Sequence, residues 1–295
     1  MDRIWNSAFA LLIVTGALLG LILPFGKIAA QSGVPPLLWT FTFSFGAAAI
    51  LCLALILRRH RFTFAPRQLR YYAIAAAISY AIPNFLIFTV MPHLGAGYTG
   101  IMYTLSPALT LLMSITLGIR RPNALGISGI IVGFIGAVMV ASTRGEMGQP
   151  AAPYWVALAL LIPALLAAGN IYRTYDWPEG ADPVELAVGS HFASAIMLLA
   201  AMLIQGEASF APLAAIPCIT IAQVIASAAM FAFYFRLQAV GGPVYLSQIG
   251  YVGAGVGLLS GTLLLGERYQ LMTWAGAAVI VIGVVMTTRA QSQKS

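Results

Sequence analysis

The sequence contains few charged residues, and this scarcity excludes most classes of soluble protein. Only 8% of its 295 residues are charged, whereas 60% are hydrophobic. Soluble domains carry about 25% charged residues, which they need for a hydrated surface. A chain with so few ions is expected to expose its surface to lipid.

Cysteine is also scarce, and metal-binding patterns are missing. Cys52 and Cys218 both fall in apolar runs and lack CxxC or Cys/His spacing. They are therefore predicted to be small buried hydrophobic residues. No HExxH, Walker or zinc-ligand pattern occurs, so we expect neither a metal nor a cofactor.

Long apolar stretches follow one another along almost the whole chain. A bilayer core about 30 Å thick needs roughly 20 residues of helix to cross it. The sequence therefore predicts an all-α membrane protein whose main partner is the lipid bilayer. Ten transmembrane helices are predicted, at residues 7–27, 36–57, 69–90, 97–118, 123–142, 153–173, 184–205, 214–237, 242–264 and 270–288.

Basic residues are distributed unevenly over the connectors. Of the 15 Lys and Arg residues, only Lys27, Arg144 and Arg268 fall on the side of the membrane opposite the N-terminus. Because basic residues are retained in the cytoplasm, both termini are predicted to be cytoplasmic, in a bacterial inner membrane. This asymmetry accounts for the net charge of +7 without a nucleic-acid partner.

The second half of the chain repeats the first. A shift of 147 residues aligns the halves without a gap, and the halves 1–147 and 148–295 are predicted to be repeats of five helices each. Five is an odd number, so the second repeat enters the membrane from the opposite side. Matched positions include Pro36/Pro183, Gly95/Gly242, Tyr98/Tyr245, Arg121/Arg268, Gly129/Gly276 and Gly136/Gly283.

Two inverted repeats predict a secondary transporter. Copies that differ slightly in conformation can exchange those conformations, which opens a central site to each side of the membrane in turn. A small-molecule substrate is then expected near the middle of the bilayer, where the repeats meet. The sequence gives no preference between a monomer and a homodimer.

Two motif segments carry a family resemblance. Leu94–Tyr98 with Ser106–Leu109, and Leu263–Arg268 followed by Gly276 and Gly283, resemble the drug/metabolite transporter superfamily in its EamA-type ten-helix form. Within it, the chain is most similar to the YddG-type exporters of aromatic amino acids. The resemblance covers essentially the whole chain. It implies that helices 1, 3, 4, 6, 8 and 9 line a central cavity and that helices 5 and 10 pack at the side.

Polar side chains within the spans are candidates for substrate binding, because they are costly in lipid. Tyr80 and Asn84 lie one turn apart in the third helix, where Pro83 can introduce a kink. Ser227 and Tyr234 share a stripe of the eighth helix. The alternative for these residues is hydrogen bonding between helices.

The fourth and ninth helices supply the remaining candidates. Tyr98 and its repeat mate Tyr245 begin these helices at opposite faces of the membrane, and they are predicted to be gates or, alternatively, interfacial anchors. Four residues deeper in the two helices are predicted to bind substrate: Met102, Tyr103, Gln248 and Tyr251.

Small residues and prolines indicate how these helices pack. Gly253, Gly257 and Gly261 form successive GxxxG steps, and Gly129 and Gly133 form another, so close backbone contact is predicted. Four prolines are predicted to interrupt the helices around the cavity: Pro24, Pro83, Pro107 and Pro163.

The expected cavity is mainly apolar with a few neutral polar groups. No Lys or Arg is predicted near the middle of the membrane, so a phosphate would lack a counter-charge. Amino acids with aromatic or other hydrophobic side chains fit this chemistry, and multidrug or lipophilic-cation export is the alternative.

Energy coupling stays open between facilitated export and proton antiport. His191 is the ionisable residue best placed inside a span. It is predicted either to carry protons or, as the favoured interpretation, to hydrogen-bond a neighbouring helix. Glu267 is expected to pair with Arg268 in a loop.

An intramembrane serine protease is a remote alternative. Gly126-Ile127-Ser128-Gly129 matches the GxSG string of rhomboid-type proteases, which would make Ser128 a nucleophile. Such strings are common in glycine-rich helices, and the histidines lack the matching context. The sequence therefore favours a transporter over an enzyme.

Overall fold

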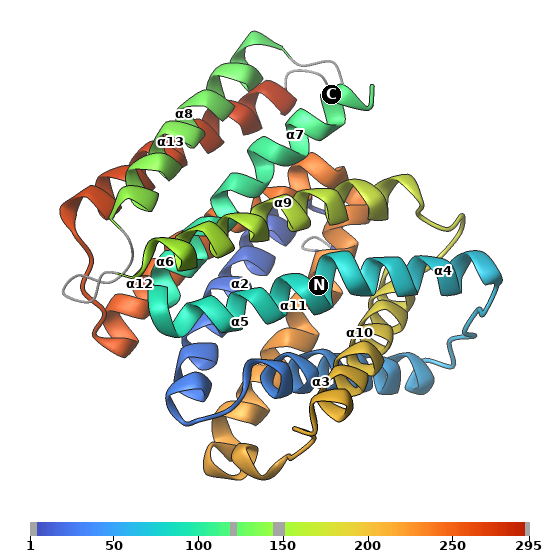
Figure 1. Cartoon of the computed structure of the whole chain (residues 1–295). Coiled ribbons are helices and arrows are strands. Elements are labelled where there is room, and N and C mark those ends of the chain that lie inside the picture. The colour runs from blue at the N-terminus through green and yellow to red at the C-terminus, as the bar shows by residue number, and fades with distance from the viewer. Residues whose placement is uncertain (1–4, 119–122, 144–150, 293–295) are drawn as a thin grey trace.

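The computed structural model describes residues 5–118, 123–143 and 151–292, and all regular structure in these ranges is helical (Figure 1). The first half contains α2 (Ala8–Gln31), α3 (Pro36–Leu57), α4 (Pro66–Ala75), a π-helical segment (Ala76–Ala81), α5 (Ile82–Leu94), α6 (Ala96–Met102), a 3₁₀ turn (Tyr103–Leu105), α7 (Ser106–Thr116) and α8 (Ala124–Ser142). The second half contains α9 (Pro153–Tyr175), α10 (Pro183–Gln205), a 3₁₀ turn (Ala211–Ala215), α11 (Pro217–Ser247), α12 (Ile249–Leu265) and α13 (Leu271–Ser292). The elements from α4 to α5 form one composite helix, and so do those from α6 to α7. Counted in this way, the elements confirm the ten predicted spans.

The helices form a multi-pass integral membrane protein. Seven helical stretches among the described residues are long and apolar enough to cross a membrane, and Ala124–Val140, Ile249–Leu265 and Leu271–Gly283 are shorter apolar helices. Large apolar side chains such as Ile204 cover the outer surface, as expected for a surface in contact with lipid. Cys218 is also exposed, so the prediction that it is buried is wrong.

Backbone conformation repeats between the two halves. Eight described residues have positive φ, and they form four pairs along the chain. The first three pairs are separated by the 147-residue shift found in the sequence, and the fourth by one residue more. The pairs are Gly33/Gly180, Arg59/Gly206, Gly95/Gly242 and Gly118/Gly266. Positive φ at equivalent places shows that both halves follow the same path.

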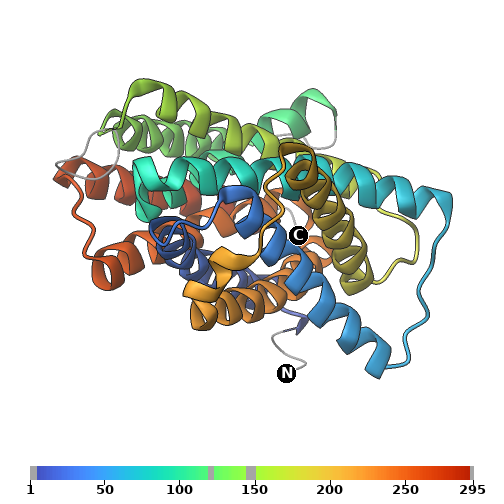
Figure 2. The same ribbon diagram turned by 60° about the horizontal axis from the view of Figure 1, so that its bottom comes forward.

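Helix packing has the same symmetry. Helices α8 and α13 pack against each other along one side of the molecule (Figure 1), which confirms the prediction for helices 5 and 10. Helix α3 packs on its repeat mate α10. Helix α2 packs on α11 and α12, and its mate α9 packs on α5 and α7. Figure 2 shows α2, in dark blue, next to α11, in orange.

Glycines allow the closest helix contacts. A Cβ atom on Gly20 of α2 would lie 2.7 Å from the carbonyl oxygen of Gly253 in α12. A Cβ atom on Gly283 of α13 would lie 2.5 Å from the carbonyl oxygen of Gly129 in α8. The predicted close packing of the small-residue steps is therefore confirmed.

The predicted interruptions occur in the third and fourth helices only. Pro83 follows the π-helical segment, and Pro107 follows the 3₁₀ turn. Both prolines stand in the first turn of a new helical segment, directly after a change in helix type. Pro24 and Pro163 lie inside α2 and α9, which continue through them.

Candidate substrate cavity

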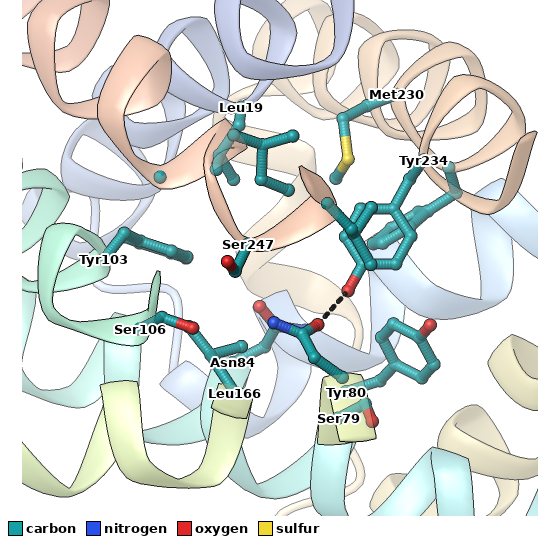
Figure 3. Close-up of a pocket in the computed structure, with 15 residues that line it drawn as sticks. Leu19, Ser79, Tyr80, Asn84, Tyr103, Ser106, Leu166, Met230, Tyr234 and Ser247 are labelled. Atoms are coloured by element: carbon teal, nitrogen blue, oxygen red, sulfur yellow. Dashed lines mark hydrogen bonds between the residues drawn. The ribbon is translucent and has the colours of Figure 1, made fainter. Parts of the chain in front are cut away.

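A small cavity lies where the two repeats meet (Figure 3). About 50 Å³ of it is open to the centres of water molecules, which is room for a few waters. The six predicted helices, 1, 3, 4, 6, 8 and 9, supply its walls. The lining residues are Leu19, Ser79, Tyr80, Asn84, Tyr103, Ser106, Leu166, Asn170, Met230, Phe231, Tyr234, Leu246, Ser247, Ile249 and Gly250.

Four of the eight residues predicted to bind substrate line this cavity, and they are brought together from both repeats. They are Tyr80, Asn84, Tyr103 and Tyr234. The π-helical segment carries Tyr80, and Asn84 follows it in the first turn of α5. Figure 3 shows Tyr103 and Tyr234 on opposite sides of the space, with Asn84 between them.

The other four predicted residues are buried outside the cavity wall. Met102 is fully buried at the end of α6, and Gln248 is fully buried just before α12. Ser227 accepts a hydrogen bond from Gln223 at 3.1 Å, within its own helix. Tyr251 is buried in α12, where it contributes to the packed core.

The two predicted gate residues are Tyr98 and Tyr245. Tyr98 is fully buried in α6, directly after the Gly95 turn. The side chain of its repeat mate, Tyr245, lies outside the described residues. A gating role for the pair stays a prediction.

A buried arginine lies next to the cavity. Arg173 of α9 is 1% exposed, and its Nη2 donates to Oδ1 of Asn170 at 2.7 Å and to the hydroxyl of Tyr234. Its Nε donates to Oε1 of Gln238 at 2.9 Å. Its Cζ lies 5.4 Å and 5.1 Å from the ring centroids of Tyr80 and Tyr234, at cation–π distance.

The distribution of basic residues predicts Arg173 on the cytoplasmic side, as one of the residues that determine topology, but the side chain is buried beside the cavity. Three of the residues that it contacts, Tyr80, Asn170 and Tyr234, line the cavity. The sequence predicts no Lys or Arg near the middle of the membrane, and so no counter-charge for an anionic substrate, whereas Arg173 places a positive charge directly beside the cavity. Asn170 was also missed, although its amide sits three residues before Arg173 on the same helix face.

Several polar groups in the cavity wall and next to it have no hydrogen-bond partner among the described residues. They include the hydroxyl of Tyr80 and both ring nitrogens of His191. The His191 ring packs against Phe231 and Tyr80, with centroids 3.8 Å and 4.3 Å apart. The favoured interpretation of His191, a hydrogen bond to a neighbouring helix, is therefore wrong.

A second buried ionic group joins three segments elsewhere in the bundle. Oε1 of Glu267 lies 2.5 Å from Nζ of Lys27 and accepts a hydrogen bond from the backbone N–H of Ala96 at 2.9 Å. Its Oε2 accepts from the N–H of Gly97 at 3.2 Å and from the hydroxyl of Tyr269. We refer to these five residues as the Glu267 cluster.

The Glu267 cluster replaces the ion pair that the sequence suggested. Glu267 is paired with Lys27, which is 240 positions away, and not with its neighbour Arg268. Burial opposes ionisation of this carboxyl, but hydrogen bonds from Lys27, Tyr269 and Ala96 hold its pKa below the ordinary value. The carboxylate also accepts from the first N–H groups of α6, which a helix leaves unpaired.

Ser128 is not arranged as a nucleophile with a histidine base. It lies exposed on α8, whereas each of the three histidines contacts another group. His60 lies 2.8 Å from Glu185, His93 stacks on Trp155, and His191 packs beside the cavity. The geometry therefore gives no support to the protease alternative.

The fold and the cavity together define a multi-pass membrane protein built from two repeats around a small cavity. The chain belongs to the EamA-like transporter family, whose pattern matches residues 6–142 and again residues 154–289. It is therefore a membrane transporter of the drug/metabolite transporter superfamily.

One solved structure, described only as the crystal structure of a protein, is similar over the full length. Its TM-score is 0.70 at 17% sequence identity, and the match covers 96% of this chain and 99% of that chain. At this identity the likeness extends to the fold alone. A comparison with curated proteins finds no match.

Proposed function

We propose that this transporter moves amino acids with aromatic or other large hydrophobic side chains across a bacterial inner membrane by alternating access. The observation that carries the proposal is the cavity between the repeats. Its wall combines three tyrosines and a phenylalanine with the amide groups of Asn84 and Asn170. Aromatic walls stack against a hydrophobic side chain, and the amides hydrogen-bond its polar backbone groups.

The cavity must widen for such a substrate to bind. It has room for only a few waters in this conformation, and an aromatic amino acid needs several times that volume. The helix breaks before Pro83 and Pro107 lie directly beside lining residues Tyr80 and Ser106. Segments on either side of a break can move against each other more easily than a continuous helix can bend.

Closure on the outer side is assigned to the Glu267 cluster. With both termini in the cytoplasm, the cluster lies at the outer ends of α2, α6 and α12. Its ion pair joins α2 to the residues that follow α12, and the hydrogen bonds from Ala96 and Gly97 add α6. Tyr98 lies one residue beyond Gly97 in the same turn. Opening to the outside would separate Lys27 and Ala96 from Glu267 while the repeats exchange conformations.

Export of lipophilic cations is the competing proposal, and one observation weighs against it. Aromatic walls attract cations, but the buried guanidinium of Arg173 lies beside the same walls and repels them. An amino acid is zwitterionic, so its carboxylate compensates for this charge.

Transport by the purified protein in liposomes tests the proposal. We expect L-phenylalanine, L-tryptophan and L-methionine to move faster than L-threonine, and tetraphenylphosphonium not to move. The assay is run with and without a pH gradient, which separates facilitated export from proton antiport. If no amino acid moves above the rate of empty liposomes, the proposed substrate class is wrong.

The Tyr80→Ala variant tests whether the cavity is the transport site. Tyr80 is 2% exposed and lines the cavity, whereas Tyr175 at the end of α9 is 82% exposed and provides a matched control. We expect Tyr80→Ala to lower phenylalanine transport at least tenfold and Tyr175→Ala to leave it unchanged. Equal transport by both variants would place the substrate path elsewhere.

A further inference from the structure

The side chain of Arg173 is a buried cation that forms no ion pair with a carboxylate of the described residues. Among the described residues, its hydrogen-bond partners are the amides of Asn170 and Gln238 and the phenol of Tyr234. Each of the ion pairs of the described residues involves a different basic group. A charge taken out of water is costly unless an opposite charge accompanies it.

The neutral partners leave part of the guanidinium unused. The bonds to Asn170, Tyr234 and Gln238 occupy Nε and Nη2, and Nη1 makes no hydrogen bond with the described residues. A guanidinium has a rigid fork of donors that matches the two oxygens of a carboxylate. The arrangement is therefore suited to an acidic ligand and is only partly satisfied without one.

The partners of Arg173 connect it to the cavity. Asn170 and Tyr234 form part of the wall, and their side chains are joined at 3.3 Å by the hydrogen bond drawn in Figure 3. A carboxylate entering from the cavity reaches Nη2 of Arg173 by taking the place of either of these oxygens. Neither exchange requires the arginine itself to leave its buried position.

We propose that Arg173 binds a single carboxylate of the transported substrate. This inference rests on the proposed transport function and narrows its substrate class to compounds that carry one carboxylate next to a hydrophobic group. One guanidinium balances one negative charge, so a dianionic phosphate would leave an excess charge in an apolar cavity. A purely cationic compound would meet uncompensated repulsion.

The opposite side of the cavity suits the other polar group of an amino acid. Ser106 lies across the cavity from Tyr234, and Asn84 lies between them (Figure 3). Their oxygens can accept hydrogen bonds from an ammonium group. The carboxylate, however, is the group that supplies the missing charge, so a compound with a carboxylate and no amine should still bind.

Three small probes separate these contributions: L-phenylalanine, 3-phenylpropionate, which lacks the amine, and phenethylamine, which lacks the carboxylate. Binding is measured as thermal stabilisation of the purified protein in detergent, and transport is measured in liposomes. We expect phenylalanine and 3-phenylpropionate to stabilise the protein and phenethylamine not to do so. Benzyl phosphate is added as a dianionic probe and should bind at least tenfold more weakly than 3-phenylpropionate.

The Arg173→Gln variant removes the charge but keeps hydrogen-bonding groups. We expect it to weaken binding of both carboxylate probes at least tenfold and to abolish the discrimination against phenethylamine. Arg236→Gln is the matched control, because Arg236 of α11 bonds to Trp5 and Asn6 and does not line the cavity. It should bind the probes as the unmodified protein does.

The outcomes separate this inference from the proposed function. Binding of 3-phenylpropionate without transport of any probe supports the role of Arg173 and contradicts amino-acid transport. Equal binding of phenethylamine and 3-phenylpropionate by the unmodified protein, or tighter binding of benzyl phosphate, overturns the inference. A loss in Arg173→Gln that is the same for all probes also overturns it, because a merely structural role would give that result.

Discussion

At the scale of single residues, the two buried ionic groups were the features that sequence patterns could not reveal. Basic residues near helix ends usually determine topology, and Arg173 was interpreted in that way. It stands in the last turn of α9. Side chains tilt toward the start of their helix, so an arginine there reaches back into the bundle. The direction of the side chain, and not its position in the sequence, places it beside the cavity.

Polar residues in the middle of apolar runs could be found from sequence, because lipid makes each of them costly. Tyr80, Asn84, Tyr103 and Tyr234 were selected on this basis, and they line the cavity. Ser227 satisfied the same criterion but bonds within its own helix. Sequence identifies which residues need a polar environment, but the fold decides whether a cavity or a neighbouring side chain provides it.

Breaking the Glu267 ion pair should destabilise the protein. The Glu267→Gln substitution leaves the ammonium group of Lys27 buried without its counter-ion, and we expect it to cost about 3 kcal/mol. The measurement is the midpoint of thermal unfolding in detergent. The double variant Lys27→Met/Glu267→Gln removes both charges and should recover most of the loss. A single variant as stable as the unmodified protein would show that the ion pair does not hold the segments together.

The same carboxylate predicts a pH dependence of stability. Its pKa is lowered in the folded protein, so folding is favoured by the ionised form. This stabilisation is fully present above the ordinary glutamate pKa of about 4.3 and is lost as the pH falls through the lower pKa of the folded state. The difference in unfolding midpoint between the unmodified protein and Glu267→Gln should stay constant from pH 8 to 5 and shrink below about pH 4.3. A difference that grows on acidification would contradict this assignment.

At the scale of helices, the spans could be predicted from length and hydropathy because these properties are local. The breaks at the π-helical segment and the 3₁₀ turn were indicated only by Pro83 and Pro107. Pro24 and Pro163 gave the same signal, yet α2 and α9 continue through them. Neighbouring helices decide whether a proline ends a helix or is accommodated, so the sequence alone could not separate the two cases.

Close contact between α2 and α12 predicts a contrast between two glycines. A Cβ on Gly20 would lie 2.6 Å from Cβ of Val256, whereas a Cβ on Gly255 of α12 meets nothing within 4 Å. We expect Gly20→Ala to destabilise the protein by about 1–3 kcal/mol through overpacking. Gly255→Ala should be neutral or slightly stabilising, because alanine favours helix. Equal effects of the two substitutions on the thermal unfolding midpoint would contradict the backbone contact.

At the scale of the whole molecule, the repeat could be predicted almost completely. The 147-residue shift reappears in glycines with positive φ such as Gly95 and Gly242, and the family match also occurs twice. Repetition constrains the global fold because each helix must have an equivalent partner in the other half. The substrate could not be fixed in the same way, because it depends on a few side chains that break the symmetry, with Arg173 among them.

Alternating access by exchange of the repeats requires that the two repeats cross the membrane in opposite directions around a shared cavity. Single cysteines at Arg61 and Ser209, both exposed in equivalent connectors of the two repeats, test it most directly. They are introduced after Cys52 and Cys218 have been replaced by alanine, and intact cells are treated with a maleimide that cannot cross the membrane. The inverted arrangement of the repeats predicts that Ser209→Cys reacts in intact cells and that Arg61→Cys reacts only after the cells are permeabilised. Reaction of both positions from the same side of the membrane would contradict the inverted arrangement, and alternating access by exchange of the repeats with it.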